Sequence, residues 1–122
     1  MGSDGSDRSR NEAVEQLQEL GLSTYAARTF VALARLGSGT AKDVSAVSAV
    51  PRTRVYDAAA ELRDEGLVDV QQSTPKRFWP VSAETAARRF RQEYARRVTA
   101  LTEALEDVES AQRPEEQRAS GP

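Results

Sequence analysis

The polar residues best suited to bind a ligand gather at the start of one segment, PRTRVYDAAAELRDEG. Arg52 and Tyr56 are four residues apart, so in a helix they are neighbours on one face, with Thr53 beside them. An arginine can bind guanine through two hydrogen bonds, and a threonine can reach a base edge or a thymine methyl group. Tyr56 can donate to a phosphate, and Arg54, which points more sideways, suits a phosphate as well. This segment therefore predicts direct contact with duplex DNA.

The outward direction of that face follows from an apolar stripe in the same segment. Val55, Ala59 and Leu62 recur at helical spacing and turn inward. Pro51 fits the first turn of the helix, where its missing N–H costs nothing. Gly66 is the stop. Tyr56 keeps a second interpretation, in which its ring packs against a neighbouring hairpin as part of the core.

Two further groups have the composition expected of DNA backbone contacts. Thr40 and Lys42 open the preceding helix, where a hydroxyl, free N–H groups and a cation can hold a phosphate. The turn QQSTPKR lacks acidic residues and suits a minor groove or the adjoining backbone. It offers Gln72, Ser73, Thr74, Lys76 and Arg77. Lys76 and Arg77 have an alternative role, which is to protect an edge strand from pairing with another chain.

The residue inventory argues against an enzyme. The chain has no histidine and no cysteine, which removes the usual general base, thiolate nucleophiles and the commonest transition-metal ligands. No nucleophile–base pair or metal-ligand set can be assembled from what remains. We therefore expect no catalytic residue, no metal site and no cofactor. With no secretory signal and no apolar run of membrane-spanning length, we expect a cytoplasmic protein associated with the nucleoid.

The net charge of −2 conceals an uneven distribution along the chain. Residues 42–97 carry 11 basic and 8 acidic side chains, whereas residues 98–122 carry 2 basic and 6 acidic ones. The net negative charge of the whole chain would argue against nucleic acid as a partner, but the excess of basic residues in 42–97 leaves nucleic acid possible as a partner.

The elements that position these residues can be read from periodicity and from helix-capping residues. Helices are expected over 11–20, 23–37, 40–48, 51–66 and 82–110, and strands over 67–72 and 77–81. Ser23, Thr40 and Ser82 are the expected N-caps. The inward stripes of the second and third helices are expected at Ala26, Phe30, Leu33 and Leu36, and at Ala41, Val44 and Val47.

The order of these elements predicts a mainly α fold with a small β-hairpin. It is a winged helix-turn-helix followed by a long C-terminal dimerisation helix. Four parts are expected: a disordered N-terminal tail over 1–10, a winged helix-turn-helix DNA-binding domain over 11–81, a long coiled-coil-like dimerisation helix over 82–110, and a disordered C-terminal tail over 111–122.

About sixty residues, from LGLSTYAARTFVALARLGSGT to TPKRFWPV, resemble the N-terminal domain of the TrmB family of archaeal and bacterial transcription regulators. The most specific pieces are VPRTRVYD, LRDEGLV and the P-K-R-F turn. The resemblance implies a winged helix that binds an operator as a dimer. It also implies that the recognition helix contains Pro51, Arg52, Thr53, Arg54 and Tyr56.

Two departures from that family matter. Members usually carry an acidic residue after the tyrosine of the second helix, where this chain has Ala26. Larger members continue into a sugar-binding effector domain, and this sequence ends before one. We therefore expect no small-molecule effector pocket, and sugar sensing is not carried over.

The last helix has an apolar seam with steps of 4, 4, 3, 4 and 3 residues, a heptad pattern with one stutter. The seam consists of Phe90, Tyr94, Val98, Leu101, Leu105 and Val108. A sixty-residue domain cannot cover a helix of about 42 Å, so a homodimer is expected; the alternative is that the helix folds back on its own domain. The arginines between Arg88 and Arg97 either attract phosphates or pair with acids one turn away.

Together these features predict a sequence-specific double-stranded DNA-binding regulator that acts as a homodimer. Its recognition helix would enter the major groove and its wing would lie on the adjacent backbone or minor groove. The alternative is a winged-helix module that docks on the transcription machinery without direct DNA readout, as the acidic C-terminal end would permit. Binding to DNA at low salt distinguishes the two.

Overall fold

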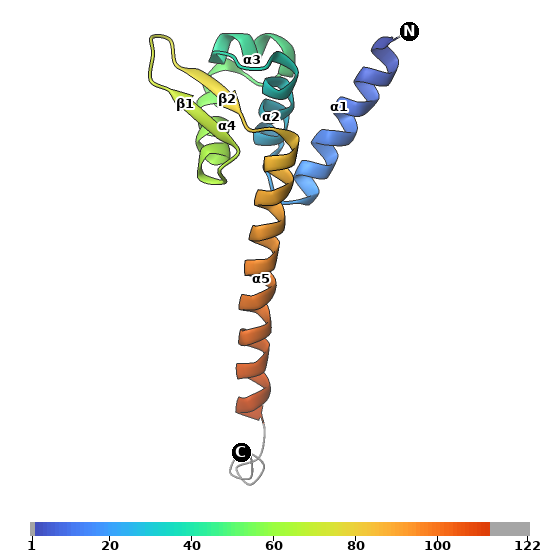
Figure 1. Ribbon diagram of the computed structural model, residues 1–122, viewed down its shortest axis with the longest axis vertical. Helices are drawn as coiled ribbons and strands as arrows, with labels where there is room; N and C mark the ends of the chain where they lie inside the picture. The colour runs from blue at the N-terminus through green and yellow to red at the C-terminus, as the bar shows by residue number, and fades with distance from the viewer. Residues whose placement is uncertain (1, 113–122) are drawn as a thin grey trace. The chain divides into compact units, whose positions relative to one another are not determined.

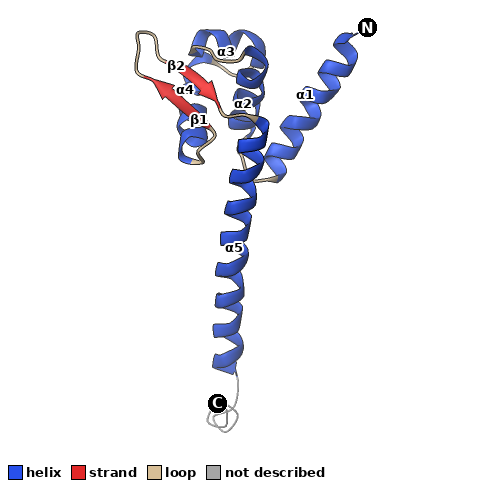
Figure 2. Ribbon diagram, viewed as in Figure 1, coloured by secondary structure: helices blue, strands red, loops and turns tan. Residues whose placement is uncertain are grey.

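The computed structural model describes residues 2–112 and contains mainly helices with one two-stranded antiparallel hairpin (Figures 1 and 2). The elements are α1 (Gly2–Glu19), α2 (Thr24–Leu36), α3 (Ala41–Ser48), α4 (Arg52–Asp64), β1 (Val68–Gln71), β2 (Arg77–Pro80) and α5 (Ala83–Gln112). This order confirms the predicted winged helix-turn-helix followed by a long helix. The chain forms two compact units, one ending at Arg89 and one beginning at Phe90, and α5 runs through the boundary.

The helices begin and end at the capping residues that the sequence predicts. The Ser23 hydroxyl accepts from the Ala26 N–H at 3.1 Å at the start of α2, and Gly37 ends that helix at φ 88°. The Ser82 hydroxyl accepts from the Thr85 N–H at 3.1 Å before α5. Pro51 precedes the first helical residue of α4 rather than occupying it, and its carbonyl accepts from the next turn.

The hairpin of β1 and β2 pairs Val68 with Pro80 and Val70 with Phe78. It is extended by an isolated bridge to the α2–α3 loop. There the Gly39 N–H donates to the Phe78 carbonyl at 3.0 Å, and the Phe78 N–H donates to the Gly39 carbonyl at 2.8 Å. These two bonds tie the wing to the residues that immediately precede α3.

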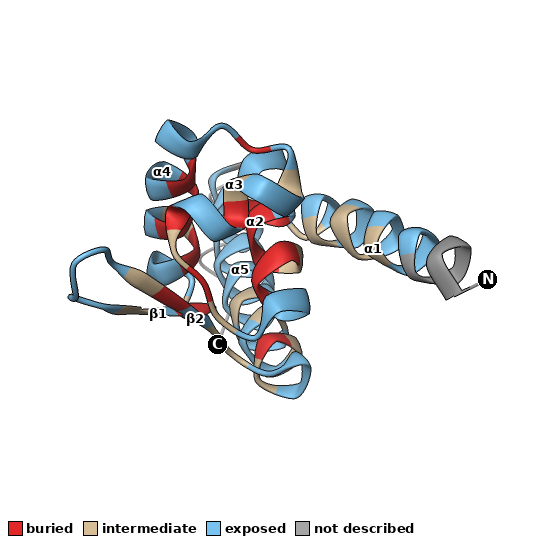
Figure 3. Cartoon of the chain, turned by 90° about the horizontal axis from the view of Figure 1, so that it is seen from above, coloured by how far each residue is buried: buried red, intermediate tan, exposed pale blue. Residues whose placement is uncertain are grey.

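The core of the first unit lies where α2, α3, α4 and the hairpin face one another, and its outer surfaces are exposed (Figure 3). Its largest fully buried side chains are Phe78, Leu33, Leu62, Leu67, Val44, Val50, Val55 and Thr29. Two residues expected in the inward stripes lie outside this core, because Leu36 and Val47 are each 40% exposed. Both lie in the last turn of their helices, α2 and α3.

Helix α1 begins at Gly2, whereas the sequence led us to expect a disordered tail over 1–10. In the described part of that stretch, Arg10 pairs with Asp7 one turn earlier. Asp7, Arg8 and Ser9 are exposed, so these three residues of the extension bury no apolar surface. That is why apolar periodicity could not find it. At the other end, α5 continues through Ala111 and Gln112, and the rest of the expected C-terminal tail, 113–122, lies outside the described residues.

Helix α5 covers the predicted range with two further residues at its end. Among the described residues, none of the helices combines the length and the apolar character that crossing a membrane would require.

Candidate nucleic-acid interface

The first turn of α4 exposes the polar face predicted from its sequence. Arg52, Thr53 and Arg54 are exposed, while Val55 is fully buried, so the inward and outward faces of the helix are those expected. Arg54 lies 3.9 Å from Asp57 across one turn, with both side chains largely exposed. An exposed pair at that distance holds its partners weakly, and the Arg54 guanidinium remains accessible to a phosphate.

Tyr56 packs against the hairpin, as the second interpretation of the sequence expected, and is also partly exposed. Its ring meets Phe78 of β2 edge to face, with centroids 6.2 Å apart and an interplanar angle of 69°. At the same time Tyr56 is 44% exposed. The ring therefore connects α4 to the wing through an aromatic contact and still has surface free for a partner.

A second contact joins α4 to the start of α2. The Glu61 carboxylate accepts from the Ser23 N–H at 2.9 Å and from the Ser23 hydroxyl at 2.7 Å. Ser23 also caps α2, so one residue anchors two helices. A carboxylate that accepts two donors at the positive end of a helix is well placed electrostatically. The orientation of α4 is thus set at both of its ends.

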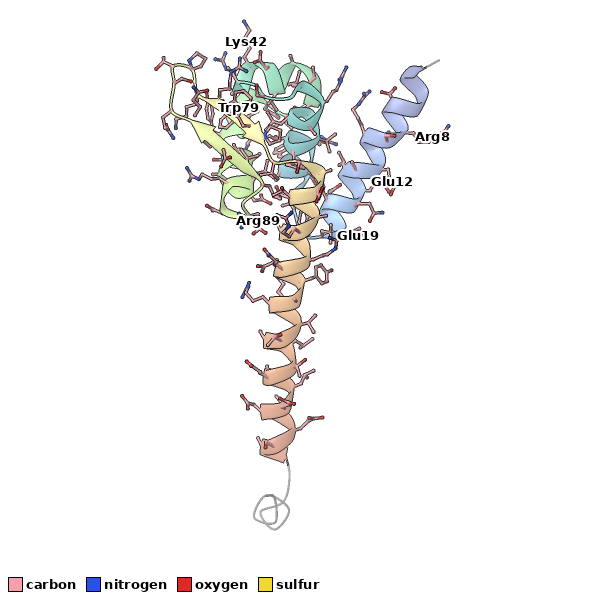
Figure 4. All side chains as sticks on the ribbon, viewed as in Figure 1. Arg8, Glu12, Glu19, Lys42, Trp79 and Arg89 are labelled. Atoms are coloured by element: carbon pink, nitrogen blue, oxygen red, sulfur yellow. The ribbon has the colours of Figure 1, made fainter. Side chains whose placement is uncertain are left out.

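The N-terminal turn of α3 differs from the expected phosphate site. Thr40 and Asp43 form a capping box, in which the Asp43 N–H donates to the Thr40 hydroxyl and the Thr40 N–H donates to the Asp43 carboxylate at 3.0 Å. These bonds to Thr40 lower the pKa of Asp43 below its ordinary value. Two of the N–H groups expected to be free are therefore engaged, and a carboxylate already occupies this helix end. Lys42 remains exposed and points outward, at the end of the unit where the loop of the hairpin also lies (Figure 4).

The hairpin tip carries three of the predicted contacts at its surface, since Ser73, Thr74 and Lys76 are exposed, as is Gln72. The Ser73 hydroxyl donates to the Pro75 carbonyl at 2.7 Å, which shapes the turn. Arg77 is different, because it is half-buried and donates to the Ser38 hydroxyl at 3.1 Å. Arg77 therefore anchors the wing to the α2–α3 loop, a role that the sequence did not suggest.

Trp79 was missed as a candidate for partner contact. Its neighbour Phe78 is buried, so Trp79 lies on the outer face of the hairpin and is 47% exposed. Its indole N–H donates to the Gln71 side chain at 3.4 Å across the two strands. The alternation of a β-strand, with Phe78 inward, could have identified Trp79 as outward-facing.

The apolar seam of α5 is exposed along most of its length. Tyr94, Val98, Leu101, Leu105 and Val108 are between 50% and 57% exposed, while Phe90 is half-buried. The arginines of this helix make some of the local pairs expected of them. The Arg96 and Arg97 guanidinium groups donate to Glu93 and lower its pKa, and Arg88 lies 4.0 Å from Glu84.

A groove of about 340 Å³ lies beside α2, with Arg10 and Val14 from α1, Arg28 and Arg35 from α2, and Val47 from α3 in its lining. It is open to solvent and bordered by arginines, unlike the enclosed and mostly apolar pockets that bind small molecules. Among the described residues, no cluster of three or more acidic side chains is arranged to hold a metal ion.

Known proteins resemble this chain mainly in its winged helix-turn-helix part. The sequence profile described as "Sugar-specific transcriptional regulator TrmB" matches residues 17–84. TrmBL1 of Pyrococcus furiosus, an HTH-type sugar sensing transcriptional regulator, is 31% identical over 97 residues, which are 80% of this chain and 28% of that protein. The structure of TrmBL2, described as an archaeal chromatin protein with a novel mode of DNA binding, has a TM-score of 0.78 at 31% identity. It matches 84% of this chain and 41% of that one. The chain thus spans less than half the length of either relative.

More distant structures share the fold alone. A MarR family regulator from Silicibacter pomeroyi has a TM-score of 0.52 at 17% identity, and the match covers 88% of this chain and 84% of that one. The transcriptional regulator Tm0710 from Thermotoga maritima has a TM-score of 0.52 at 10% identity over 98% of this chain and 94% of that one.

Proposed function

Because the chain belongs to the TrmB family of transcriptional regulators, we propose that it binds specific sequences of duplex DNA as a homodimer. The family consists of regulators rather than enzymes. The matched region is the winged helix, and sugar sensing is not part of the proposal.

The observation that carries the proposal is the exposed face at the start of α4. Arg52 and Thr53 lie on it beside the half-exposed Tyr56, on a helix held at both ends by Tyr56–Phe78 and Glu61–Ser23 contacts. A helix that presents arginine and threonine at its N-terminal end has the features of a major-groove recognition helix. Pro51 lies at the entry of this helix, and Arg54 would contact a phosphate.

The wing would supply the second set of contacts, on the adjacent backbone or in the minor groove. Ser73, Thr74 and Lys76 are exposed polar residues of the wing. Arg77 would contribute indirectly, because its bond to Ser38 holds the wing against the α2–α3 loop. Lys42 would reach a phosphate as a single charge, with Thr40 supporting it through the geometry of the capping box.

Dimerisation would occur through the α5 seam. Five neighbouring apolar side chains that are half exposed form a continuous apolar stripe, and such stripes usually mark interaction sites. Two copies related by a two-fold axis would present two recognition helices to a palindromic site. TrmBL2 is described as a chromatin protein that binds DNA, which supports an association of this chain with the nucleoid.

The proposal is tested by comparing cognate and random duplexes. The cognate site is first obtained by chromatin immunoprecipitation with sequencing, and affinities are then measured by fluorescence anisotropy at several salt concentrations. Replacing Arg52 by alanine should cost about 1–3 kcal/mol on the cognate site and much less on random DNA.

The matched control is Arg63→Ala, which removes an exposed arginine from the other end of the same helix. It should leave the preference for the cognate site unchanged. Equal losses on both duplexes for Arg52→Ala would contradict direct base readout by this residue.

A second candidate function is a protein-interaction module of the transcription machinery that does not read DNA. The exposed Trp79 favours it, because exposed aromatic side chains are common in protein interfaces. Complete lack of DNA binding at low salt, together with a stable complex in a pull-down that Trp79→Ala abolishes, would support this function instead.

A further inference from the structure

The outer face of α2 carries two arginines, and the helix contains no acidic residue. Arg28 and Arg35 are both exposed, and they are two turns apart, about 10 Å along the helix axis. In the described part of the chain neither arginine takes part in an ion pair. Their charges are therefore available to an anionic partner.

Both arginines line the groove of about 340 Å³ beside α2, which we call the arginine groove. Its charged lining residues are Arg10, Glu15, Arg28 and Arg35, so the groove has a formal charge of +2. Arg10 already pairs with Asp7, which leaves the two arginines of α2 as the main source of this charge.

The arginine groove lies close to the start of α4. Ser48 lines the groove, and Arg52 follows four residues later, so their Cα atoms are at most about 14 Å apart. The Ser48 hydroxyl accepts from the Val50 N–H at 3.1 Å, within the turn that joins α3 to α4. The hairpin and α1 lie on opposite sides of α2 and α3 (Figures 1 and 3). The unit thus has the wing on one side and the arginine groove on the other.

This arrangement fits the backbone of duplex DNA. The major groove is about 12 Å wide, so a helix inside it has a row of phosphates on each side. The wing would meet one row, and the arginine groove is placed for the other. A guanidinium group can bind a phosphate through two parallel hydrogen bonds, and the apolar stem of an arginine can lie over a valine or an alanine while its charge stays in water.

An amphipathic acidic segment of a protein fits the arginine groove less well, because it also needs an apolar surface to cover. Val14 and Val31 are already half-buried and Ala32 is buried, so only Val47, at 40%, is largely exposed among the apolar lining residues. Charge, rather than uncovered apolar surface, is what this groove offers to a partner.

We propose that Arg28 and Arg35 bind phosphates of the duplex backbone outside the bases that α4 contacts. This inference rests on the proposed function and adds to it a third contact surface, beside α4 and the wing. The contact carries no sequence information, because phosphates are the same in every base pair.

The salt dependence of DNA binding tests the proposal. Each phosphate contact adds about 0.9 to the steepness with which the logarithm of the binding constant falls with the logarithm of the salt concentration. Arg28→Gln and Arg35→Gln should each reduce the steepness by about this amount, and glutamine has nearly the helix propensity of arginine. Affinities of the full chain are measured by fluorescence anisotropy on cognate and on random duplexes. Both duplexes should lose affinity by the same factor.

Two variants control for general effects of charge and of folding. Arg63→Gln removes an exposed arginine from the other end of α4 and should leave the salt dependence unchanged. Arg35→Lys keeps the charge and should retain most of the wild-type salt dependence.

Reduced salt dependence in both glutamine variants of α2, with the wild-type preference for the cognate site, supports the proposal. Unchanged salt dependence overturns it and leaves the proposed function intact, as does an equal reduction in Arg63→Gln. If the wild type binds no DNA at low salt, both proposals fail. If light scattering shows that only the Arg28→Gln/Arg35→Gln protein falls to the mass of one chain, 13.3 kDa, the groove holds a second copy instead of DNA, which also overturns the proposal.

Discussion

Among individual residues, Gly66 lies close to the Arg89 side chain at the end of α4. Gly66 ends α4 at φ 74°, and a Cβ at this position would lie 2.9 Å from Cζ of Arg89. The Arg89 guanidinium thus lies against the C-terminal end of α4, where a cation is favoured by the helix dipole. Both residues belong to the first unit, and Figure 4 labels Arg89 at this place. Because Arg89 is exposed and its guanidinium is the far end of a flexible side chain, it can move aside for a Cβ, so Gly66 is needed for its conformation.

Gly66→Ala should therefore destabilise the protein by about 1–2 kcal/mol, the cost of a left-handed backbone for an L-residue, with little further loss from Arg89. Gly37→Ala is the comparison without a nearby side chain, because no atom lies within 4 Å of a Cβ at Gly37. The free energies of unfolding are measured by urea denaturation at one protein concentration.

Removal of the Arg89 side chain tests that cause. Arg89→Ala should change the stability of the wild type and of Gly66→Ala by equal amounts. If it recovers stability in the Gly66→Ala protein alone, the close approach to Arg89 contributes to the loss.

Among the elements, α3 begins at the predicted residue, but its N-terminal turn is occupied by a capping box. Thr40 is the expected N-cap, but Asp43 returns its carboxylate to the Thr40 N–H. The usual capping-box pattern has glutamate or glutamine at that position, so an aspartate gave a weaker signal. The carboxylate stabilises α3 and reduces the capacity of its first turn to hold a phosphate.

The capping box predicts a pH dependence of stability. Because hydrogen bonds to Thr40 lower the pKa of Asp43 in the folded protein from its ordinary 3.8, its ionised form stabilises the fold. That contribution is fully present above pH 3.8 and is lost as the pH falls through the lowered pKa. Unfolding free energies of the wild type and of Asp43→Asn are compared by denaturation from pH 6 downward.

The wild type should be more stable than Asp43→Asn near neutral pH, and the difference should shrink below about pH 4. Arg63→Gln serves as the control, since it removes an exposed charge that is not among those acting on Asp43. A difference that stays constant down to the lowest pH would contradict a role for the ionised carboxylate.

For the whole molecule, the long helix and the winged helix are expected to act together. DNA binding by a dimer gains from two linked contacts, because the second half-site is bound at a high effective concentration. Loss of the pairing should therefore weaken binding to a palindromic site while leaving the recognition face of α4 unchanged.

Leu101→Glu should convert the protein to a monomer and reduce its affinity for the full site at least tenfold, since linked binding commonly contributes a hundredfold or more, about 10² to 10⁴. Affinity for an isolated half-site should change little. Mass is measured by light scattering and affinity by fluorescence anisotropy. Thr99→Glu adds the same charge to an exposed position of α5 outside the seam, and it should remain dimeric. A Leu101→Glu protein that still dimerises would show that the contact lies elsewhere.

Features that depend on residues close in the chain could be read from the sequence alone. Ser23, Thr40 and Gly37 specify helix ends within one turn of themselves, and Val55 and Leu62 show which face of α4 is buried. These signals are local because helical hydrogen bonds join residues three or four positions apart. Local rules failed at Leu36 and Val47, whose exposure depends on whether another element covers them.

The contacts that join α4 and the wing to the rest of the first unit link residues far apart in the chain. Glu61 meets Ser23 across 38 positions, Arg77 meets Ser38 across 39, and Tyr56 meets Phe78 from another element. No periodicity encodes such partners, because they are chosen by how whole elements pack. The sequence thus specified which residues α4 would expose, whereas the tertiary structure decided that Arg77 anchors the wing and that Tyr56 joins the wing to α4.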